Sequence, residues 1–286
     1  MADPTTRTGR APARMRVESL FRYPVKSMLG ESVDRLFVDE RGAEGDRRLA
    51  LLDAATGHVA SAKQARLWRG LLQCTARGEA GGVSIALPDG TLVAADDPQA
   101  DELLSRLLGR TVRLISRRGA GATVERPDPE LLLDLGLDAE VGGILLEIGK
   151  ATPGESFTDD APLHAITTAT LAHIGVEALR YRPNVVIATP PGYPPYAEND
   201  WAGAELTVGA ARLRVIEATP RCVVPTLEHG PLPLAPQALR TPGAENRFRT
   251  SGSEAQRPCA GAYLAVVEPG VIVPGDAVVW TADTTG

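Results

Sequence analysis

The chain has 286 residues, 43% of them hydrophobic and 4% aromatic, with a formal net charge of −6. This length can bury a sizeable core and exceeds the usual size of one domain, so we expect two domains or one large compound one. The acidic balance argues against a nucleic acid partner, because such binding needs Lys and Arg to replace phosphate counterions. The three cysteines contain no Cys-x-x-Cys pair, so they imply neither a disulfide framework nor a zinc ribbon, and a reducing compartment is expected.

Both ends of the chain are polar. Residues 1–14 are predicted to be a disordered tail that lacks the apolar core of a signal peptide, and residues 282–286 are assigned to a second tail. No window of about 18 apolar residues occurs, which predicts no membrane span and no membrane partner. We therefore expect a cytoplasmic protein.

Residues 15–117 are predicted to form a first β-rich unit. Across residues 16–23, apolar and polar side chains alternate with period two, the pattern of a half-buried strand. The Pro-Asp-Gly run at 88–90 indicates a hairpin turn, and residues 97–108 place apolar side chains on one helical face. Further strands are expected at residues 32–38, 48–52, 71–77, 83–87, 91–93 and 111–116. Short strands at this spacing are typical of a barrel or a sandwich.

A second β-rich unit is predicted over residues 159–281, after a linker at 118–158 that is rich in Gly and Pro. Residues 167–180 are expected to be a helix with a weak point at Gly175. Its strands are expected at residues 185–187, 205–208, 212–216, 263–267 and 276–280. The predicted fold class is mainly β with some α, in two packed β-barrel-like units with a cleft between them.

Two proline-rich segments, residues 189–196 and 231–258, are predicted to lack regular structure, because proline is excluded from a central strand. In sequence they flank motifs around Asn184 and Cys222. We therefore expect both segments to border the mouth of any pocket that those motifs build.

Two short motifs carry side chains suited to chemistry. Cys222 follows Arg221, and a neighbouring cation can hold a thiol as the thiolate, which binds soft metals or attacks electrophiles. A lone cysteine of this kind is more often a buried structural thiol. Lys26 and Ser27 follow Pro24, where a rigid turn can aim a point charge and a hydroxyl at one ligand; a solvated turn is the alternative.

Further polar residues are less specific. Arg182 and Asn184 combine a guanidinium fork with an amide that both donates and accepts, which suits a pterin edge or a phosphate. An Asn that caps a turn is the alternative. Arg47 lies in a Gly-Asp-Arg-Arg run, and two adjacent arginines are more often surface charge. Cys259, His58, His164 and His173 lack partners in sequence, and we interpret them as structural.

Four stretches, in their chain order, resemble the MOSC family: residues 23–27 (YPVKS), 182–187 (RPNVVI), 219–226 (TPRCVVPT) and 269–278 (PGVIVPGDAV). The resemblance is strongest to the two-part members, the amidoxime-reducing molybdenum proteins with an N-terminal MOSC barrel. It runs from about Met15 to about Trp280, nearly the whole chain. It implies a MOSC N-terminal β-barrel over 15–117 and a MOSC domain over 159–281.

The resemblance also implies a cofactor and its contacts. Cys222 would ligate the molybdenum of the molybdenum cofactor and act as the catalytic residue, and a thiolate suits such a soft metal centre. Lys26, Ser27 and Arg47 would contact the phosphate of the pyranopterin. The other implied cofactor contacts are Thr167, Arg182, Asn184 and Arg221. The chain has Ala260 where members commonly place an aromatic before Gly261, which puts substrate preference in doubt.

The activity implied by the resemblance is a molybdenum-cofactor-dependent reduction of small N-hydroxylated substrates, such as amidoximes or hydroxylamines. No ferredoxin-like cysteine cluster follows Trp280, so electrons are expected from a separate donor protein, a ferredoxin or a b-type cytochrome with its reductase. Two alternatives stay open: a sulfur carrier or transferase with a persulfide on Cys222, and a non-catalytic cofactor-binding protein.

Overall fold

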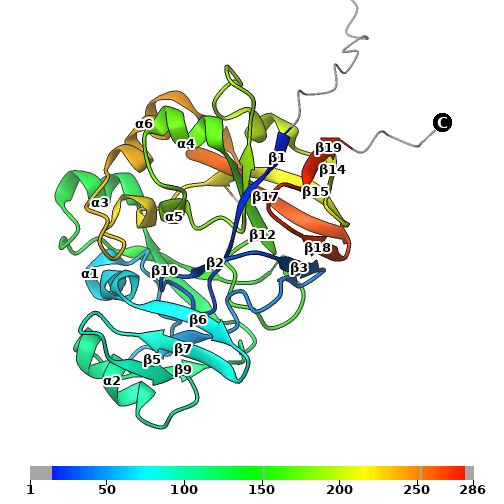
Figure 1. Cartoon of the computed structure of the whole chain (residues 1–286). Coiled ribbons are helices and arrows are strands. Elements are labelled where there is room, and N and C mark those ends of the chain that lie inside the picture. The colour runs from blue at the N-terminus through cyan, green and yellow to red at the C-terminus, as the bar shows by residue number, and fades with distance from the viewer. Residues whose placement is uncertain (1–14, 151, 252, 281–286) are drawn as a thin grey trace, which may run out of the picture.

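The computed structural model describes residues 15–150, 152–251 and 253–280. The tails predicted at 1–14 and 282–286 lie outside these residues. The chain is mainly β, in two packed units, as the sequence predicted (Figure 1). No helix in the described part of the chain is long and apolar enough to cross a membrane.

The larger unit is a closed barrel of seven strands. Strand β12 (Leu163–Thr167) pairs in parallel with β13 (Val185–Ala188), and the other neighbouring pairs are antiparallel. The order continues through β1 (Met15–Arg22), β19 (Ala277–Trp280), β14 (Glu205–Val208), β15 (Ala211–Pro220) and β17 (Gln256–Glu268). Strand β17 also pairs with β12, so the ring closes and these strands leave no free edge.

Alternation along the strands builds the core of the barrel. In β1, Met15 and Val17 are buried while the residues beside them are exposed. A register shift between Val17 and Ser19 then moves the inward position to Leu20, which is fully buried. The bulge therefore keeps an apolar side chain in the core where strict alternation would place Ser19.

Strand β1 belongs to the barrel, although the sequence-based boundary placed it in the first unit. Its neighbours β13 and β19 come from residues 185–188 and 277–280. Local alternation identifies a strand but not its partners, which are fixed by long-range register. Strand β2 (Glu31–Val33) pairs with the end of β1 and is followed by β3.

The smaller unit surrounds a second core that contains Leu51, Leu71, Ile85 and Leu104. Strand β5 (Ala50–Asp53) pairs with β9 (Val112–Ile115), and β7 (Gly82–Ala86) lies between β6 (Thr75–Glu79) and β8 (Leu92–Ala94). Its helices are α1 (Ala65–Trp68), the 3₁₀ helix η1 (Arg69–Gln73) and α2 (Ala100–Leu108). Residues 71–73, predicted as strand, are helical, because one turn buries both Leu71 and Leu72.

A small sheet joins the two ends of the chain. Strand β3 (Leu36–Asp39) pairs with β4 (Gly42–Ala43) on one side and with β18 (Gly270–Ile272) on the other. Its buried side chains Leu36, Val38 and Ile272 pack into the barrel core. This sheet therefore ties the first unit to the second.

The segment 118–158 is more regular than a linker. It contains a hairpin of β10 (Thr123–Pro127) and β11 (Gly143–Glu147), with α3 (Pro129–Leu135) between them. Asp128 caps α3 by accepting from the backbone N–H groups of Glu130 and Leu131, both at 2.9 Å. The sequence hid this hairpin because side chains of β11 are exposed and apolar, so no clean alternation marks it.

The predicted helix at 167–180 divides at Gly175 into α4 (Thr168–Ile174) and α5 (Ala178–Tyr181), because Gly175 adopts a left-handed φ of +74°. Segment 189–196 lacks helix and strand, as predicted, and leads into the 3₁₀ helix η2 (Ala197–Trp201). A third 3₁₀ turn, η3 (Val224–Thr226), follows β15.

The expectation of no regular structure at 231–258 is wrong. The segment contains α6 (Gln237–Glu245), β16 (Arg247–Arg249) and the start of β17. Pro242 lies inside α6 and cannot donate to the carbonyl of Ala238. The hydroxyl of Tyr181 donates to that carbonyl at 2.6 Å instead, so tertiary structure supplies the missing bond.

Candidate functional site

A cavity of about 120 Å³ opens where the barrel meets the smaller unit. Its described walls come from the smaller unit, from the segment around the β10–β11 hairpin, and from the barrel. Seven basic and two acidic side chains line it: Lys26, Arg47, Lys63, Arg126, Arg180, Arg182 and Arg221, with Asp159 and Asp160. On a chain with net charge −6, this surplus makes the cavity a local site for an anion.

Seven of the eight predicted site residues line this cavity: Lys26, Ser27, Arg47, Arg182, Asn184, Arg221 and Cys222. The eighth, Thr167, does not. It caps α4 by accepting from the N–H of Thr170 at 3.2 Å, and its hydroxyl donates to the buried Glu198 at 2.9 Å. A Thr ahead of a helix is a common N-cap, and sequence alone does not separate that role from ligand contact.

The two proline-rich segments were also expected at this pocket. Neither 189–196 nor 231–258 contributes a residue to the described lining. Their neighbours in sequence reach the cavity, but the chain turns away from it at both places. Proximity in sequence therefore did not carry over into space.

Backbone strain gathers at the cavity. Among the described non-glycine residues, four have a positive φ, and three of these line the cavity: Ser27 at +65°, Arg47 at +46° and Arg182 at +55°. Such left-handed conformations cost about 1–3 kcal/mol each and persist only where surrounding structure fixes them. The fold therefore holds these three side chains in place at a cost to stability.

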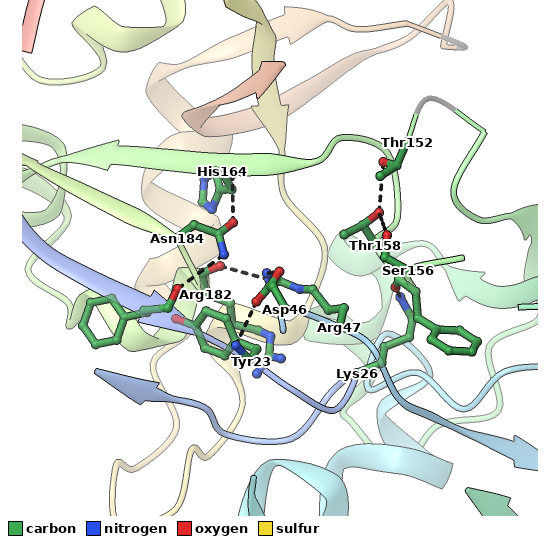
Figure 2. Close-up of polar contacts among 12 residues, drawn as sticks. Tyr23, Lys26, Asp46, Arg47, Thr152, Ser156, Thr158, His164, Arg182 and Asn184 are labelled. Atoms are coloured by element: carbon green, nitrogen blue, oxygen red, sulfur yellow. Dashed lines mark hydrogen bonds and ion pairs between the residues drawn. The ribbon is translucent and has the colours of Figure 1, made fainter. Parts of the chain in front are cut away.

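Tyr23 forms the platform under two of these arginines (Figure 2). The guanidinium of Arg47 lies 4.7 Å from the centre of its ring, and that of Arg182 lies 4.4 Å from it. Asp46 accepts from the backbone N–H of Tyr23 at 2.8 Å and also pairs with Arg47. Burial would lower the pKa of Arg47, but Asp46 outweighs it and raises that pKa.

One guanidinium nitrogen of Arg182 lacks a hydrogen-bond partner among the described residues. Its Nη1 donates to the carbonyl of Met28 at 2.5 Å, whereas its Nη2 is buried and has no hydrogen-bond partner among the described residues. Burial, together with the neighbouring Arg47, lowers the pKa of Arg182 to about 10, so it stays charged at neutral pH. A buried, charged and unpaired donor that lines a cavity suits an anionic ligand.

Asn184 is largely occupied by the protein itself. Its Oδ1 accepts from the N–H of His164 at 3.2 Å, and its Nδ2 donates to the carbonyl of Phe21 at 3.4 Å (Figure 2). It thus bridges β12 and β1 beside the cavity. These contacts join two strands and do not cap a turn, and Asn184 also lines the cavity.

Lys26 pairs with Asp159, a residue that the sequence analysis did not single out. Its Nζ donates to the carbonyl of Phe157 at 2.8 Å and to Asp159 at 2.7 Å. Lys63 contacts the other oxygen of the same carboxylate at 3.0 Å. Burial raises the pKa of Asp159, but the two ammonium groups outweigh it and hold that pKa well below its usual range. For Lys26, burial dominates and lowers the pKa.

Arg221 and His164 form a second polar contact on the wall. The Nη2 of Arg221 lies 3.3 Å from the Nε2 of His164, and its Nε donates to the carbonyl of Thr219 at 3.1 Å. Burial, and then the charge of Arg221, lowers the pKa of His164 well below its ordinary value, so the ring is neutral and its Nε2 accepts. Gly261 makes this possible, because a Cβ there would lie 2.4 Å from that nitrogen.

Cys222 differs from the other two cysteines. Cys74 and Cys259 are fully buried, and burial raises the pKa of their thiols to about 12 and about 11. Cys222 is partly exposed and lines the cavity directly after Arg221. It is therefore the cysteine with access to a ligand in this cavity.

Sequence reasoning missed Lys63 and Asp159 and took His164 as structural only. Asp159 is the first residue of the predicted second unit, directly after the segment assigned to a linker, and Lys63 lies in a loop before α1. The side chain of Lys63 is almost completely buried and that of Asp159 is partly buried. The charged partners of both residues lie far away in sequence. In the sequence, the adjacent carboxylates of Asp159 and Asp160 are a weak signal for this site, because they do not reveal Lys26 and Lys63 as partners.

Family models match both halves of the chain. A model of the MOSC domain matches residues 154–279, and a model of the MOSC N-terminal beta barrel domain matches residues 14–109. The chain belongs to the MOSC family and has its two-part architecture. MOSC domains bind the molybdenum cofactor, so a general function related to that cofactor follows for this MOSC protein.

Two solved structures that resemble the MOSC protein share little sequence identity with it. The YUAD protein from Bacillus subtilis is 12% identical, covers 94% of this chain and 96% of its own, and has a TM-score of 0.42. YiiM from Geobacillus stearothermophilus is 19% identical over 44% of this chain and 57% of its own, with a TM-score of 0.31. No functionally curated protein matches the chain.

Proposed function

We propose that this MOSC protein binds the molybdenum cofactor in the cavity between its two units and reduces N-hydroxylated compounds such as amidoximes and hydroxylamines. One observation carries the proposal. Cys222, a partly exposed thiol, lines the same small cavity as basic side chains from both halves of the chain. A soft metal ligand and an anion site thus lie together, as a phosphorylated metal cofactor requires.

The residues present fit this cofactor. The unpaired Nη2 of Arg182 and the ammonium groups of Lys26 and Lys63 offer donors for a phosphate. Cys222 offers one sulfur ligand. No group of three His, Cys, Asp or Glu among residues 15–150, 152–251 and 253–280 could hold a metal ion, so under this proposal Cys222 is the protein's ligand to the metal.

The chain's own residues would bind and orient the cofactor, and they would set the charge of the site. When bound, the cofactor would supply the two-electron removal of the oxygen of an N–OH group, which leaves as water with two protons. Lys26 and Arg182 would hold the phosphate, and the Tyr23 platform would keep Arg182 in place. Cys222 would face the reacting group from the cavity wall. Electrons would come from a separate donor protein.

Metal analysis of the purified protein tests the proposal most directly. We expect close to one molybdenum per chain, and we expect its loss in Cys222→Ser, which keeps a polar side chain of similar size. Reduction of benzamidoxime with a chemical electron donor should be lost in the same variant. If the wild type binds no molybdenum when the cofactor is supplied, the proposal fails.

The test also separates the alternative in which Cys222 carries sulfur. A persulfide on Cys222 would be an anion in a cavity with a surplus of cations, so the site suits it electrostatically. Mass spectrometry of protein incubated with a sulfur donor would then show one added sulfur on Cys222 and no molybdenum. That result would replace the reductase by a sulfur carrier or transferase.

A further inference from the structure

We propose that the carboxylate of Asp159 is an internal anion that occupies the lysine pair of the cavity, and that a phosphate monoester dianion binds there by displacing it. The inference rests on the proposed function, because it concerns how the same site accepts its anion. It assigns Asp159 the role of setting which anions bind.

The carboxylate spans the two lysines. Its Oδ1 lies 2.7 Å from the Nζ of Lys26 and its Oδ2 lies 3.0 Å from the Nζ of Lys63. This is the arrangement in which two oxygens of a phosphate would contact the same two groups. Asp159 thus occupies the position that the ligand needs.

Solvent exposure shows that the carboxylate of Asp159 lies between the two lysines and the solvent. The side chain of Asp159 is 30% exposed, whereas those of Lys26 and Lys63 are 6% and 9% exposed. The carboxylate therefore lies on the open side of the two ammonium groups. An anion that enters from solvent meets this negative charge before it meets the lysines.

The backbone around Asp159 is anchored, so displacement requires only rotation of its side chain. The N–H of Phe157 donates to the carbonyl of Arg47 at 2.8 Å, and the carbonyl of Asp159 accepts from Gly149 at 3.0 Å. Hydroxyls of Thr152, Ser156 and Thr158 bond to one another on the same segment (Figure 2). Phe157 is fully buried. The segment itself is therefore expected to stay in place when phosphate binds.

Charge makes the exchange selective. A single carboxylate compensates one of the two lysine charges, whereas a phosphate dianion compensates both and brings more acceptor oxygens. A monoanion would only replace one carboxylate by another charge of the same size. The pair of Lys26 and Lys63 with Asp159 therefore favours phosphate monoesters over monoanions.

The experiment measures inorganic phosphate binding by calorimetry on the full chain without metal, at about pH 8, where phosphate is mainly dianionic. We expect Asp159→Asn to tighten binding by about tenfold, because the competing carboxylate is gone. Asp160→Asn is the matched control. This substitution removes the same charge from the adjacent residue, whose carboxylate contacts the hydroxyl of Tyr263 at 3.4 Å and contacts neither lysine. It should change the affinity for phosphate by less than about threefold.

Three outcomes would overturn the inference. Weaker phosphate binding in Asp159→Asn would show that Asp159 positions the lysines and does not compete. Equal tightening in both variants would show a general charge effect. Undiminished binding in a Lys26→Ala, Asp159→Asn double variant would place the phosphate elsewhere.

A measurement on the wild type keeps the inference testable if Asp159→Asn does not fold. In a crystal soaked with phosphate, we expect the anion on Lys26 and Lys63 and the Asp159 carboxylate rotated out of hydrogen-bond distance of Lys63. Phosphate bound with both carboxylate contacts intact would refute displacement. These results need no molybdenum, so a protein that binds molybdenum but fails them keeps its proposed function, and the reverse also holds.

Discussion

Arg47 donates a hydrogen bond from its Nη2 to the backbone carbonyl of Arg182 at 3.1 Å. The two residues come from different halves of the chain, and both hold a left-handed backbone conformation. Contact between two buried cations is unfavourable unless something compensates it, and here Asp46 and the ring of Tyr23 do so. The hydrogen bond therefore joins the two units at the cavity.

Replacement of Cys222 should separate function from stability. We expect Cys222→Ala to lose molybdenum and activity while its free energy of unfolding changes by less than about 1 kcal/mol, because the side chain is partly exposed. Cys259→Ala is the matched control. That cysteine is fully buried, so we expect a loss of about 1–2 kcal/mol with molybdenum content retained. Denaturant unfolding and metal analysis check both, and an active Cys222→Ala would make the thiol structural.

Tyr23 offers a test of the platform with two substitutions. Its hydroxyl is buried and has no hydrogen-bond partner among the described residues, so Tyr23→Phe should leave stability unchanged or raise it slightly. Tyr23→Leu removes the ring under Arg47 and Arg182 and should weaken phosphate binding by about 0.5–2 kcal/mol. Calorimetry distinguishes them. If both variants bind phosphate equally, the ring does not support the arginines.

Gly261 should tolerate no side chain. Its φ is +79°, and an added Cβ would lie 2.4 Å from His164 Nε2 and 2.6 Å from the carbonyl of Ala165. Gly203 has a similar φ of +85° with nothing within 4 Å, so Gly203→Ala isolates the backbone cost of about 1–2 kcal/mol. We expect Gly261→Ala to cost at least about 1 kcal/mol more. Denaturant unfolding measures both variants. Similar losses of unfolding free energy would show that the His164 side chain moves aside at little cost.

Stability should fall on acidification because of the buried histidines, to which His229 contributes beside His164. His229 is fully buried, and its Nδ1 donates to the carbonyl of Leu227 at 2.9 Å. Burial lowers its pKa to about 4. Below about pH 6.5, His229 is protonated in the unfolded chain but stays neutral in the folded chain. The free energy of unfolding therefore falls between about pH 6.5 and about pH 4, by up to about 3 kcal/mol. The loss is absent above pH 6.5.

His229→Gln is the variant that checks this assignment. It removes the titrating group, so its unfolding free energy should depend less on pH between 6.5 and 4 than that of the wild type. Urea unfolding at several pH values measures the difference. Identical pH profiles for the two proteins would assign the acid sensitivity to other groups.

Much of the site was predictable because its local signals are strong. Lys26, Arg182 and Cys222 lie within two residues of a proline, close to the end of a strand or helix, and such turns are visible in sequence. Lys63 and Asp159 were not predictable, because their role arises only where separate segments meet. The helix α6 was hidden by Pro242, whose missing hydrogen bond is replaced through Tyr181, a residue remote in sequence. Local rules do not include such tertiary compensation.

Strand β1 has a consequence for how the chain folds. It is made early during synthesis, but its barrel neighbours β13 and β19 follow more than half a chain later, and β19 ends at Trp280. The barrel therefore cannot close until the strand at 277–280 has left the ribosome, and until then β1 lacks both of these neighbours and can pair with β2. A fragment that starts after β1 would have a gap between β13 and β19, with two open strand edges able to pair with other chains. The barrel that contains most of the MOSC domain is thus not separable at the boundary the sequence suggests.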